Sequence, residues 1–269
     1  MKVRVISGAV LAAILVAVLL LGGPVLCLAL LFCSIVGMYE MYKALGVLQE
    51  GSPVSPLAGV GYGGAVFYYM LLLINQQFFG VGAAIVVIAI VACYVINFPK
   101  YKSVEVISTC FSFIYIGFML SFVYLTRIDT SGIVRVWIVF ATSWVADTAA
   151  YFTGVKFGKH KMTPVLSPKK TWEGAAGGII GAGIAGIILA AIFERGSILP
   201  YFLICMTGAV ISICGDLAAS AIKREKGIKD YGTLIPGHGG IMDRFDSILF
   251  TGPFVYYYIA IVLVHFQLG

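Results

Sequence analysis

The chain has 269 residues, of which 61% are hydrophobic and 11% charged, and its mean hydropathy is +1.02. A soluble domain is closer to half apolar and a quarter charged, so this composition excludes an ordinary soluble protein and indicates an integral membrane protein. The net charge of +6 is typical of basic cytoplasmic loops in such a protein, and we expect no nucleic-acid partner.

Apolar stretches long enough to cross a bilayer, which takes about 20 residues, recur along the whole chain. Each must be a helix, because lipid offers no partner for backbone N–H and C=O groups. We therefore predict an all-α integral membrane protein, a polytopic bundle of about nine transmembrane helices whose first helix is not a cleaved signal. The predicted spans are 4–22, 25–42, 57–75, 80–97, 104–125, 132–154, 174–193, 199–221 and 247–266.

Lysine and arginine predict the orientation, since they are enriched in cytoplasmic loops. Fifteen of the eighteen lie on the side of the N-terminus, and only Arg127, Arg135 and Arg195 lie on or near the other side. We expect a cytoplasmic N-terminus and two basic cytoplasmic loops, 155–173 and 222–246, which can then build one site.

Two acidic residues, Glu40 and Asp147, lie within or at the end of predicted spans before the first basic loop. Glu40 lies at the end of the second span, and we interpret it as an ordinary interfacial residue. Asp147 is expected to be buried about two turns inside the sixth span, leading into the first basic loop, and is a candidate site residue.

The glycines of 174–186 are interpreted as helix-packing positions rather than a nucleotide fingerprint, because no strand precedes them.

The first basic loop ends in the dense polar run Ser167–Gly174. Lys169 and Lys170 are point charges suited to phosphate, and Glu173 at the helix entry favours a site wall. The alternative interpretation is a topology signal, with Trp172 as an anchor at the membrane interface.

Asp216 lies inside the eighth span, where a carboxylate costs several kcal/mol unless it is paired, hydrated or metal-bound. Ser220 and Lys223 follow it at i+4 and i+7, so the three side chains share one helix face. The alternative to a functional role is a structural Asp–Lys pair within the bundle.

The stretch 220–246 is the most polar part of the chain. Four cations precede a glycine-rich turn at 237–240, and a pair of aspartates, Asp243 and Asp246, follows it. Cations and backbone N–H groups suit phosphates, while closely spaced carboxylates suit a hard divalent metal. Either aspartate could instead cap the ninth helix, and His238 fits a phosphate contact or a turn. The four cations are Lys223, Arg224, Lys226 and Lys229.

These residues resemble the signature of the phosphatidate cytidylyltransferases, also called CDP-diacylglycerol synthases. The signature is long and specific, and this chain fills every fixed place in it. The matching residues are Ser220, Lys223, Arg224, Lys229, Asp230, Pro236, His238, Gly239, Gly240, Asp243, Arg244 and Asp246. The wider similarity extends over the C-terminal half. We therefore predict a helical N-terminal region, 1–100, for packing or oligomerisation, and a catalytic region, 101–269.

The resemblance implies transfer of a cytidylyl group from CTP to phosphatidic acid in phospholipid biosynthesis, giving CDP-diacylglycerol and pyrophosphate. It implies Mg²⁺, with room for a second cation, held by Asp216, Asp243 and Asp246, and Lys223 as a further catalytic residue. It also implies a homodimer in the cell membrane with its active site facing the cytoplasm. The implied substrate-binding residues are Ser220, Arg224, Lys229, His238, Gly239, Gly240, Arg244, Lys169, Lys170 and Asp147.

Four other functions compete with this one. A secondary transporter for an anionic solute would use Asp147 and Asp216 as coupling acids, but the sequence shows no inverted repeat or paired broken helices. A CTP-dependent lipid kinase, or a synthase acting on ether-linked lipids, is closer in chemistry. A purely structural membrane subunit fits least, given the intramembrane acids. The cytidylyltransferase hypothesis depends on Asp216 and Asp243 converging on one cation.

Overall fold

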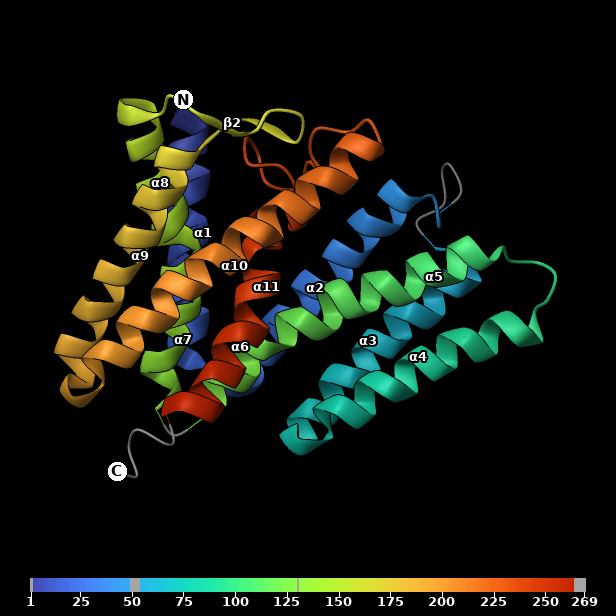
Figure 1. Cartoon of the computed structure of the whole chain (residues 1–269). Helices are drawn as coiled ribbons and strands as arrows, with labels where there is room; N and C mark the ends of the chain where they lie inside the picture. The colour runs from blue at the N-terminus through green and yellow to red at the C-terminus, as the bar shows by residue number, and fades with distance from the viewer. Residues whose placement is uncertain (1, 49–53, 130, 264–269) are drawn as a thin grey trace. The chain divides into compact units, whose positions relative to one another are not determined.

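The computed structural model describes residues 2–48, 54–129 and 131–263. Its elements are almost all helices (Figure 1), with one two-stranded antiparallel hairpin. The helices are α1 Lys2–Leu21, α2 Gly23–Leu45, α3 Pro56–Ile74, α4 Phe79–Ile96, α5 Ser103–Ser112, α6 Met119–Ile128, α7 Gly132–Phe140, α8 Ala146–Phe157, α9 Trp172–Phe193, α10 Ile198–Glu225 and α11 Met242–Tyr258. The strands are β1 Lys161–Thr163 and β2 Ser167–Thr171.

Segments of π-helix join or extend several of these helices. One at Phe113–Phe118 connects α5 to α6, another at Ala141–Val145 connects α7 to α8, and a third, Ile259–Leu263, follows α11. Each of the nine predicted spans therefore coincides with a helix or a joined pair of helices. The last residues of the predicted span 247–266 lie outside the described part of the chain.

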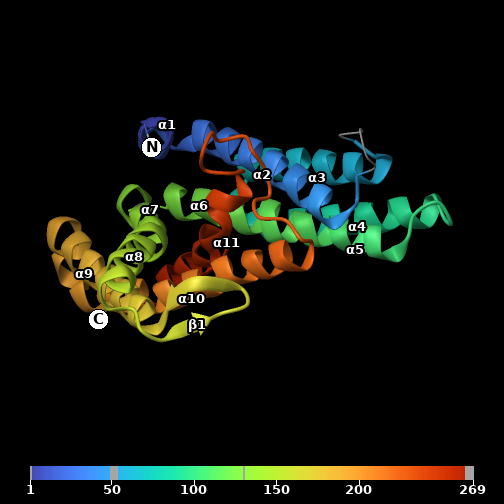
Figure 2. The same cartoon turned by 90° about the horizontal axis from the view of Figure 1, so that it is seen from above.

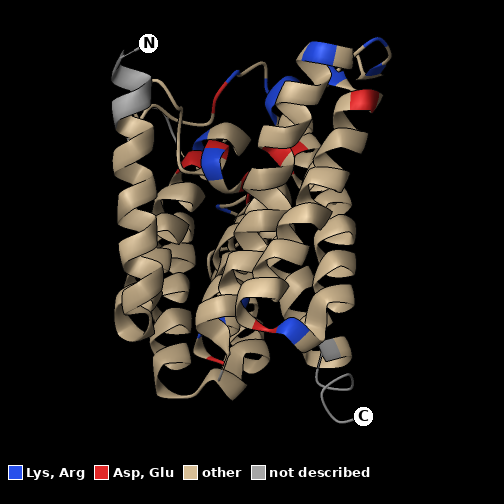
Figure 3. Cartoon of the chain, turned by 90° about the vertical axis from the view of Figure 1, so that its left-hand side faces the viewer, with Lys and Arg blue, Asp and Glu red and all other residues tan. Residues whose placement is uncertain are grey.

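The helices have the length and composition of membrane spans. Among the described residues, eight helical stretches are long and apolar enough to cross a membrane, and the shorter apolar helix Ser7–Leu21 precedes them. Figure 3 shows Lys, Arg, Asp and Glu mostly near helix ends, with long uncharged stretches between. The prediction of an all-α, polytopic membrane protein is confirmed.

Local sequence explains where α2 ends and where α3 begins. Gly46 ends α2 in the left-handed region, at φ 76°, where a side chain would be strained. Ser55 begins α3, because its side chain accepts the N–H of Ala58 at 3.1 Å and Pro56 follows at the first helical position.

The chain divides into two compact units. The first unit contains Met1–Tyr124 and Lys226–Arg244, and the second contains Leu125–Glu225 and Phe245–Gly269. In the first unit, α2 packs against α1, α3 and α5; in the second, α9 packs against α8 and α10 (Figures 1 and 2). This division follows packing and does not test the functional division predicted at residue 100, which stays a prediction.

Small residues let α9 approach its neighbours closely. A Cβ at Gly178 would lie 2.8 Å from the backbone oxygen of Ala146 on α8, and one at Gly186 would collide with the backbone of Tyr201 on α10. The interpretation of the glycines in 174–186 as packing positions is confirmed.

Candidate functional site

Asp216 is the centre of a polar cluster in the second unit. Its carboxylate on α10 forms an ion pair with Lys170 from β2, and Ser220, one turn on, donates a hydrogen bond to Asp216 Oδ1 at 3.4 Å. The prediction that Asp216 and Ser220 share a helix face is confirmed. The two paired side chains remain 26% and 24% exposed, while the Lys170 Nζ atom itself is buried.

Two further acids accompany Asp216. Asp246 on α11 is buried, accepts the backbone N–H of Ser247 at 2.8 Å, and lies within electrostatic range of Asp216, Asp147 and Lys223. Gly215 permits this approach, since a Cβ there would lie 2.8 Å from the backbone oxygen of Asp246. The second unit thus brings together acids from α8, α10 and α11.

The chemistry of this donor set fits a hard cation. Neighbouring carboxylates repel one another unless a positive charge compensates them, and carboxylate oxygens are the ligands that Mg²⁺ prefers. Within the described residues, however, no three His, Cys, Asp or Glu side chains are already gathered as a metal-binding group. Lys170 supplies the compensating charge to Asp216 in this arrangement.

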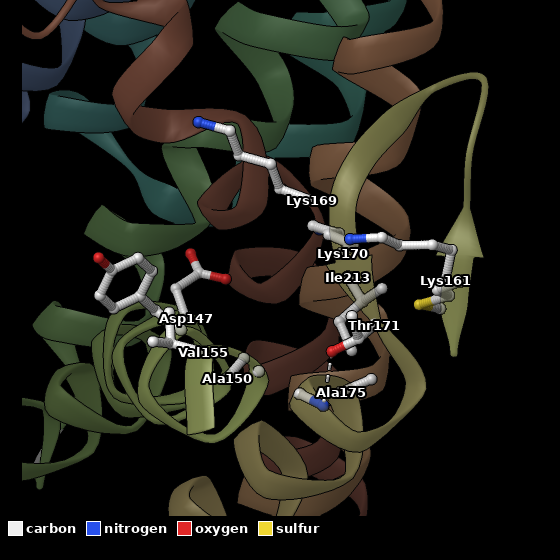
Figure 4. A pocket seen from close by; sticks show the side chains of 13 residues that line it. Asp147, Ala150, Val155, Lys161, Lys169, Lys170, Thr171, Ala175 and Ile213 are labelled. Atoms are coloured by element: carbon white, nitrogen blue, oxygen red, sulfur yellow. Dashed lines mark hydrogen bonds between the residues drawn. The ribbon is translucent and has the colours of Figure 1, made fainter. Parts of the chain in front are cut away.

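A cavity of about 390 Å³ opens beside this cluster (Figure 4). Asp147 reaches it from α8, while Lys169 and Lys170 reach it from β2. The prediction that Asp147 is buried is wrong: its side chain is exposed and lines the cavity. The cavity combines cations with an apolar wall, a composition suited to a phosphate that carries hydrocarbon. Its remaining lining residues are Ala150, Tyr151, Gly154, Val155, Lys161, Met162, Thr171, Gly174, Ala175 and Ile213.

The lysines of this cavity stand on the β1–β2 hairpin, which Glu173 fixes at its base. Glu173 accepts the backbone N–H groups of Lys159 and His160, each at 3.2 Å, and approaches His160 Nδ1 at 2.6 Å. Arg224 Nε donates to the backbone oxygen of Leu166, between the strands, at 3.4 Å. Trp172 is 58% exposed, as an interfacial anchor would be.

The glycine-rich turn belongs to the first unit and encloses a second cavity, of about 340 Å³. Gly237 and Gly239 have φ values of 78° and 83°, a region that other residues rarely adopt, so the predicted tight turn is confirmed. Lys229, Arg244 and His238 supply cationic or hydrogen-bonding side chains. The other lining residues are Asp230, Gly232, Thr233 and Ile235.

Two polar side chains, Ser7 and Asp243, hold this turn from within the first unit. Ser7 on α1 donates to the backbone oxygen of Pro236 at 3.1 Å and lies 3.0 Å from His238 Nδ1. Asp243 Oδ2 accepts the N–H groups of Tyr231 at 2.8 Å and Gly240 at 3.0 Å. The Gly240 N–H is thereby engaged within the loop, and the Asp243 carboxylate ties two parts of the loop together.

Asp243 belongs to the first unit and Asp216 to the second. The predicted convergence of these two carboxylates on one cation therefore stays a prediction, as does the role of Asp243 as a metal ligand.

Glu40 has a role that the sequence analysis missed. Its side chain is only 3% exposed, Oε1 accepts the N–H of Ile241 at 3.0 Å, and Oε2 accepts the N–H of Met242 at 2.9 Å. The interpretation of Glu40 as an ordinary interfacial residue is wrong. The available signal was the cost of a lone acid within an apolar helix.

Comparisons with known proteins identify relatives over the whole chain. The profile of the cytidylyltransferase family matches residues 2–262. The chain is 42% identical over 154 residues to a phosphatidate cytidylyltransferase of Bacillus subtilis (strain 168), covering 55% of this chain and 56% of that protein. A phosphatidate cytidylyltransferase of Haemophilus influenzae is 43% identical over 134 residues, covering 46% of this chain and 45% of that protein.

These two alignments thus span about half the length of each relative. A third relative, the phosphatidate cytidylyltransferase of Staphylococcus epidermidis, aligns over almost the whole length. It is 29% identical over 257 residues, covering 94% of this chain and 96% of that protein.

Proposed function

Because this chain belongs to the cytidylyltransferase family, we propose that it transfers the cytidylyl group of CTP to phosphatidic acid, giving CDP-diacylglycerol and pyrophosphate. The observation that carries this proposal is the complete signature in 220–246. Relatives named phosphatidate cytidylyltransferase support the choice of acceptor.

In this reaction the protein positions the two phosphates and neutralises their charge, and it need not form a covalent bond with the substrates. A phosphate oxygen of the lipid forms a bond to the α-phosphorus of CTP, and the bond from that phosphorus to the oxygen bridging to the β-phosphate breaks. Pyrophosphate leaves with the electron pair. The lipid phosphate is already ionised at neutral pH, so no general base is required.

The proposed roles follow the chemistry of the side chains. In the second unit, Lys169, Lys170, Lys223 and Arg224 neutralise phosphate charge, beside a cavity whose apolar wall suits a lipid substrate. In the first unit, Lys229, Arg244 and His238 line a cavity suited to phosphate groups.

We propose Mg²⁺ as the cofactor, held by Asp216 and Asp246. When bound, the ion would neutralise charge on the triphosphate and stabilise the leaving pyrophosphate. The further assignment of Asp243 to the metal, and of a second cation, depends on the motif alone. Without the ion, the ion pair with Lys170 holds the Asp216 carboxylate in place.

We also propose where the protein lies in the cell and that it forms a homodimer. Fifteen of eighteen lysines and arginines lie on the side predicted to be cytoplasmic, which supports an enzyme of the cell membrane with a cytoplasmic active site. A homodimer is proposed from the family resemblance, and cross-linking in native membranes tests it.

The test is incubation of the purified protein with phosphatidic acid, Mg²⁺ and CTP labelled in either the α- or the γ-phosphate. Label from the α-position should enter the lipid, while label from the γ-position should appear in pyrophosphate. Entry of γ-label into lipid would instead identify a lipid kinase. Uptake of an anion by proteoliposomes, without any labelled lipid, would favour the transporter.

A further inference from the structure

The carboxylate of Glu40 accepts hydrogen bonds at the start of α11, a contact that no motif in the sequence predicts. The first N–H groups of a helix have no partner within it. Here the N–H of Met242, the first residue of α11, and that of Ile241 before it are accepted by the two carboxylate oxygens of Glu40, from α2. The cap of α11 therefore comes from a residue about 200 positions earlier in the chain.

The free-energy cost of burying a carboxylate explains why Glu40 needs these two backbone partners. A buried carboxylate is costly unless hydrogen bonds or charges compensate it. Backbone N–H groups and the positive end of a helix dipole provide that compensation for Glu40. Loss of the carboxylate would leave two buried N–H groups unpaired, and each carries its own desolvation cost.

The glycine-rich loop is shaped around this carboxylate. A Cβ at Gly232 or at Gly240 would collide with the Glu40 carboxylate. Gly240 also donates its N–H to Asp243, and Tyr231 donates to the same oxygen. Glu40 and Asp243 together accept four backbone N–H groups of the loop and the start of α11, those of Tyr231, Gly240, Ile241 and Met242.

We infer that Glu40 is a positioning residue, which fixes the loop that encloses the cavity of about 340 Å³ and thereby sets the affinity of this cavity for the phosphates of CTP. The inference rests on the proposed function for the identity of the ligand. Glu40 does not line the cavity, and both its oxygens are engaged by the loop, so it acts through the loop rather than on the substrate.

The experiment compares Glu40→Gln with Glu105→Gln in the full-length protein. Glu105 is a matched control, because its Oε2 also accepts a backbone N–H at a helix start, that of Lys102 immediately before its own helix α5. In E40Q, the side-chain amide would keep one acceptor oxygen and place its NH₂ group against the second backbone N–H. We expect E40Q to raise the KM for CTP about tenfold, with the KM for phosphatidic acid unchanged, and E105Q to change neither.

Hydrogen exchange separates failure of this inference from failure of the proposed function. Peptides covering 238–243 should exchange faster in E40Q than in the wild type, whether or not the protein acts on CTP. Absence of a lipid product from the wild type would refute only the function. Unchanged exchange and an unchanged KM in E40Q would overturn the role of Glu40.

A second variant keeps the carboxylate but displaces it. Gly240→Ala introduces a Cβ against Glu40, and it should raise the KM for CTP and the exchange of 238–243 in the same direction. Loss of the folded protein in both E40Q and G240A would overturn the inference in favour of a purely structural role.

Discussion

Replacement of Asp216 by Asn removes a charge while preserving the volume of the side chain. The side chains of the Asp216–Lys170 pair are 26% and 24% exposed, but the Lys170 Nζ atom is buried, so loss of the carboxylate lowers the free energy of unfolding by about 1–3 kcal/mol. A folded domain is stable by about 5–15 kcal/mol, and D216N should therefore remain folded. Its turnover should fall by about a hundredfold or more, which corresponds to about 2.7 kcal/mol in the activation free energy.

The assay measures pyrophosphate release and labelled lipid from purified protein in detergent, beside a thermal unfolding curve. Asp129→Asn is the matched control, because Asp129 also pairs with a cation, Arg135, at 2.6 Å, but lies on the predicted outer side. We expect D129N to retain activity to within about twofold. Near-normal turnover of folded D216N would remove Asp216 from the metal site, and severe loss in D129N would contradict the predicted topology.

Three further results are expected. Chelation of divalent cations should abolish turnover. Added Mg²⁺ should raise the unfolding temperature of the wild type but not of Asp246→Asn, because a ligand stabilises only the state that binds it. An equal rise in both proteins would exclude Asp246 as a ligand. The single hydroxyl proton of Ser7 can serve both contacts only if it goes to Pro236 and His238 Nδ1 donates to Ser7 at 3.0 Å. Ser7→Ala should therefore lower the share of the Nδ1–H tautomer in ¹⁵N NMR spectra, and an unchanged share would refute this arrangement. Gly186→Ala should destabilise the protein by about 1–3 kcal/mol through overpacking, measured by thermal unfolding, whereas Gly196→Ala should not, since a Cβ at Gly196 meets nothing within 4 Å.

Hydropathy alone predicted the helices well, because lipid permits few other backbone conformations. The predicted boundaries differ where a helix continues beyond the apolar core. The span 199–221 is the clearest example, since α10 runs over Ile198–Glu225. Lys223 and Arg224 occupy its last turn, where cations interact favourably with the helix dipole. Helix propensity and the dipole thus extend the helix past the end of the hydrophobic run.

Contacts between distant segments could not be predicted in this way. The spacing of Asp216, Ser220 and Lys223 placed them on one helix face, but the observed ion pair of Asp216 is with Lys170 on a hairpin. The hairpin was itself expected only as a loop, because its strands are short and polar. Sequence spacing determines neighbours along one helix; packing determines neighbours across elements.

The acids of this chain differ in what engages them, and this difference bears on their function. Both oxygens of Glu40 are held by backbone N–H groups, which cannot move away without opening the start of α11. Asp216 is engaged by two side chains, those of Lys170 and Ser220, which can rotate while the fold stays intact. If Mg²⁺ binds as proposed, Asp216 could hold it after Lys170 rotates away, and the Lys170 ammonium group would then be available to a phosphate, whereas the backbone partners of Glu40 could give way only if the loop opened. By this argument Asp216 is suited to bind a metal, and Glu40 is suited to hold the loop.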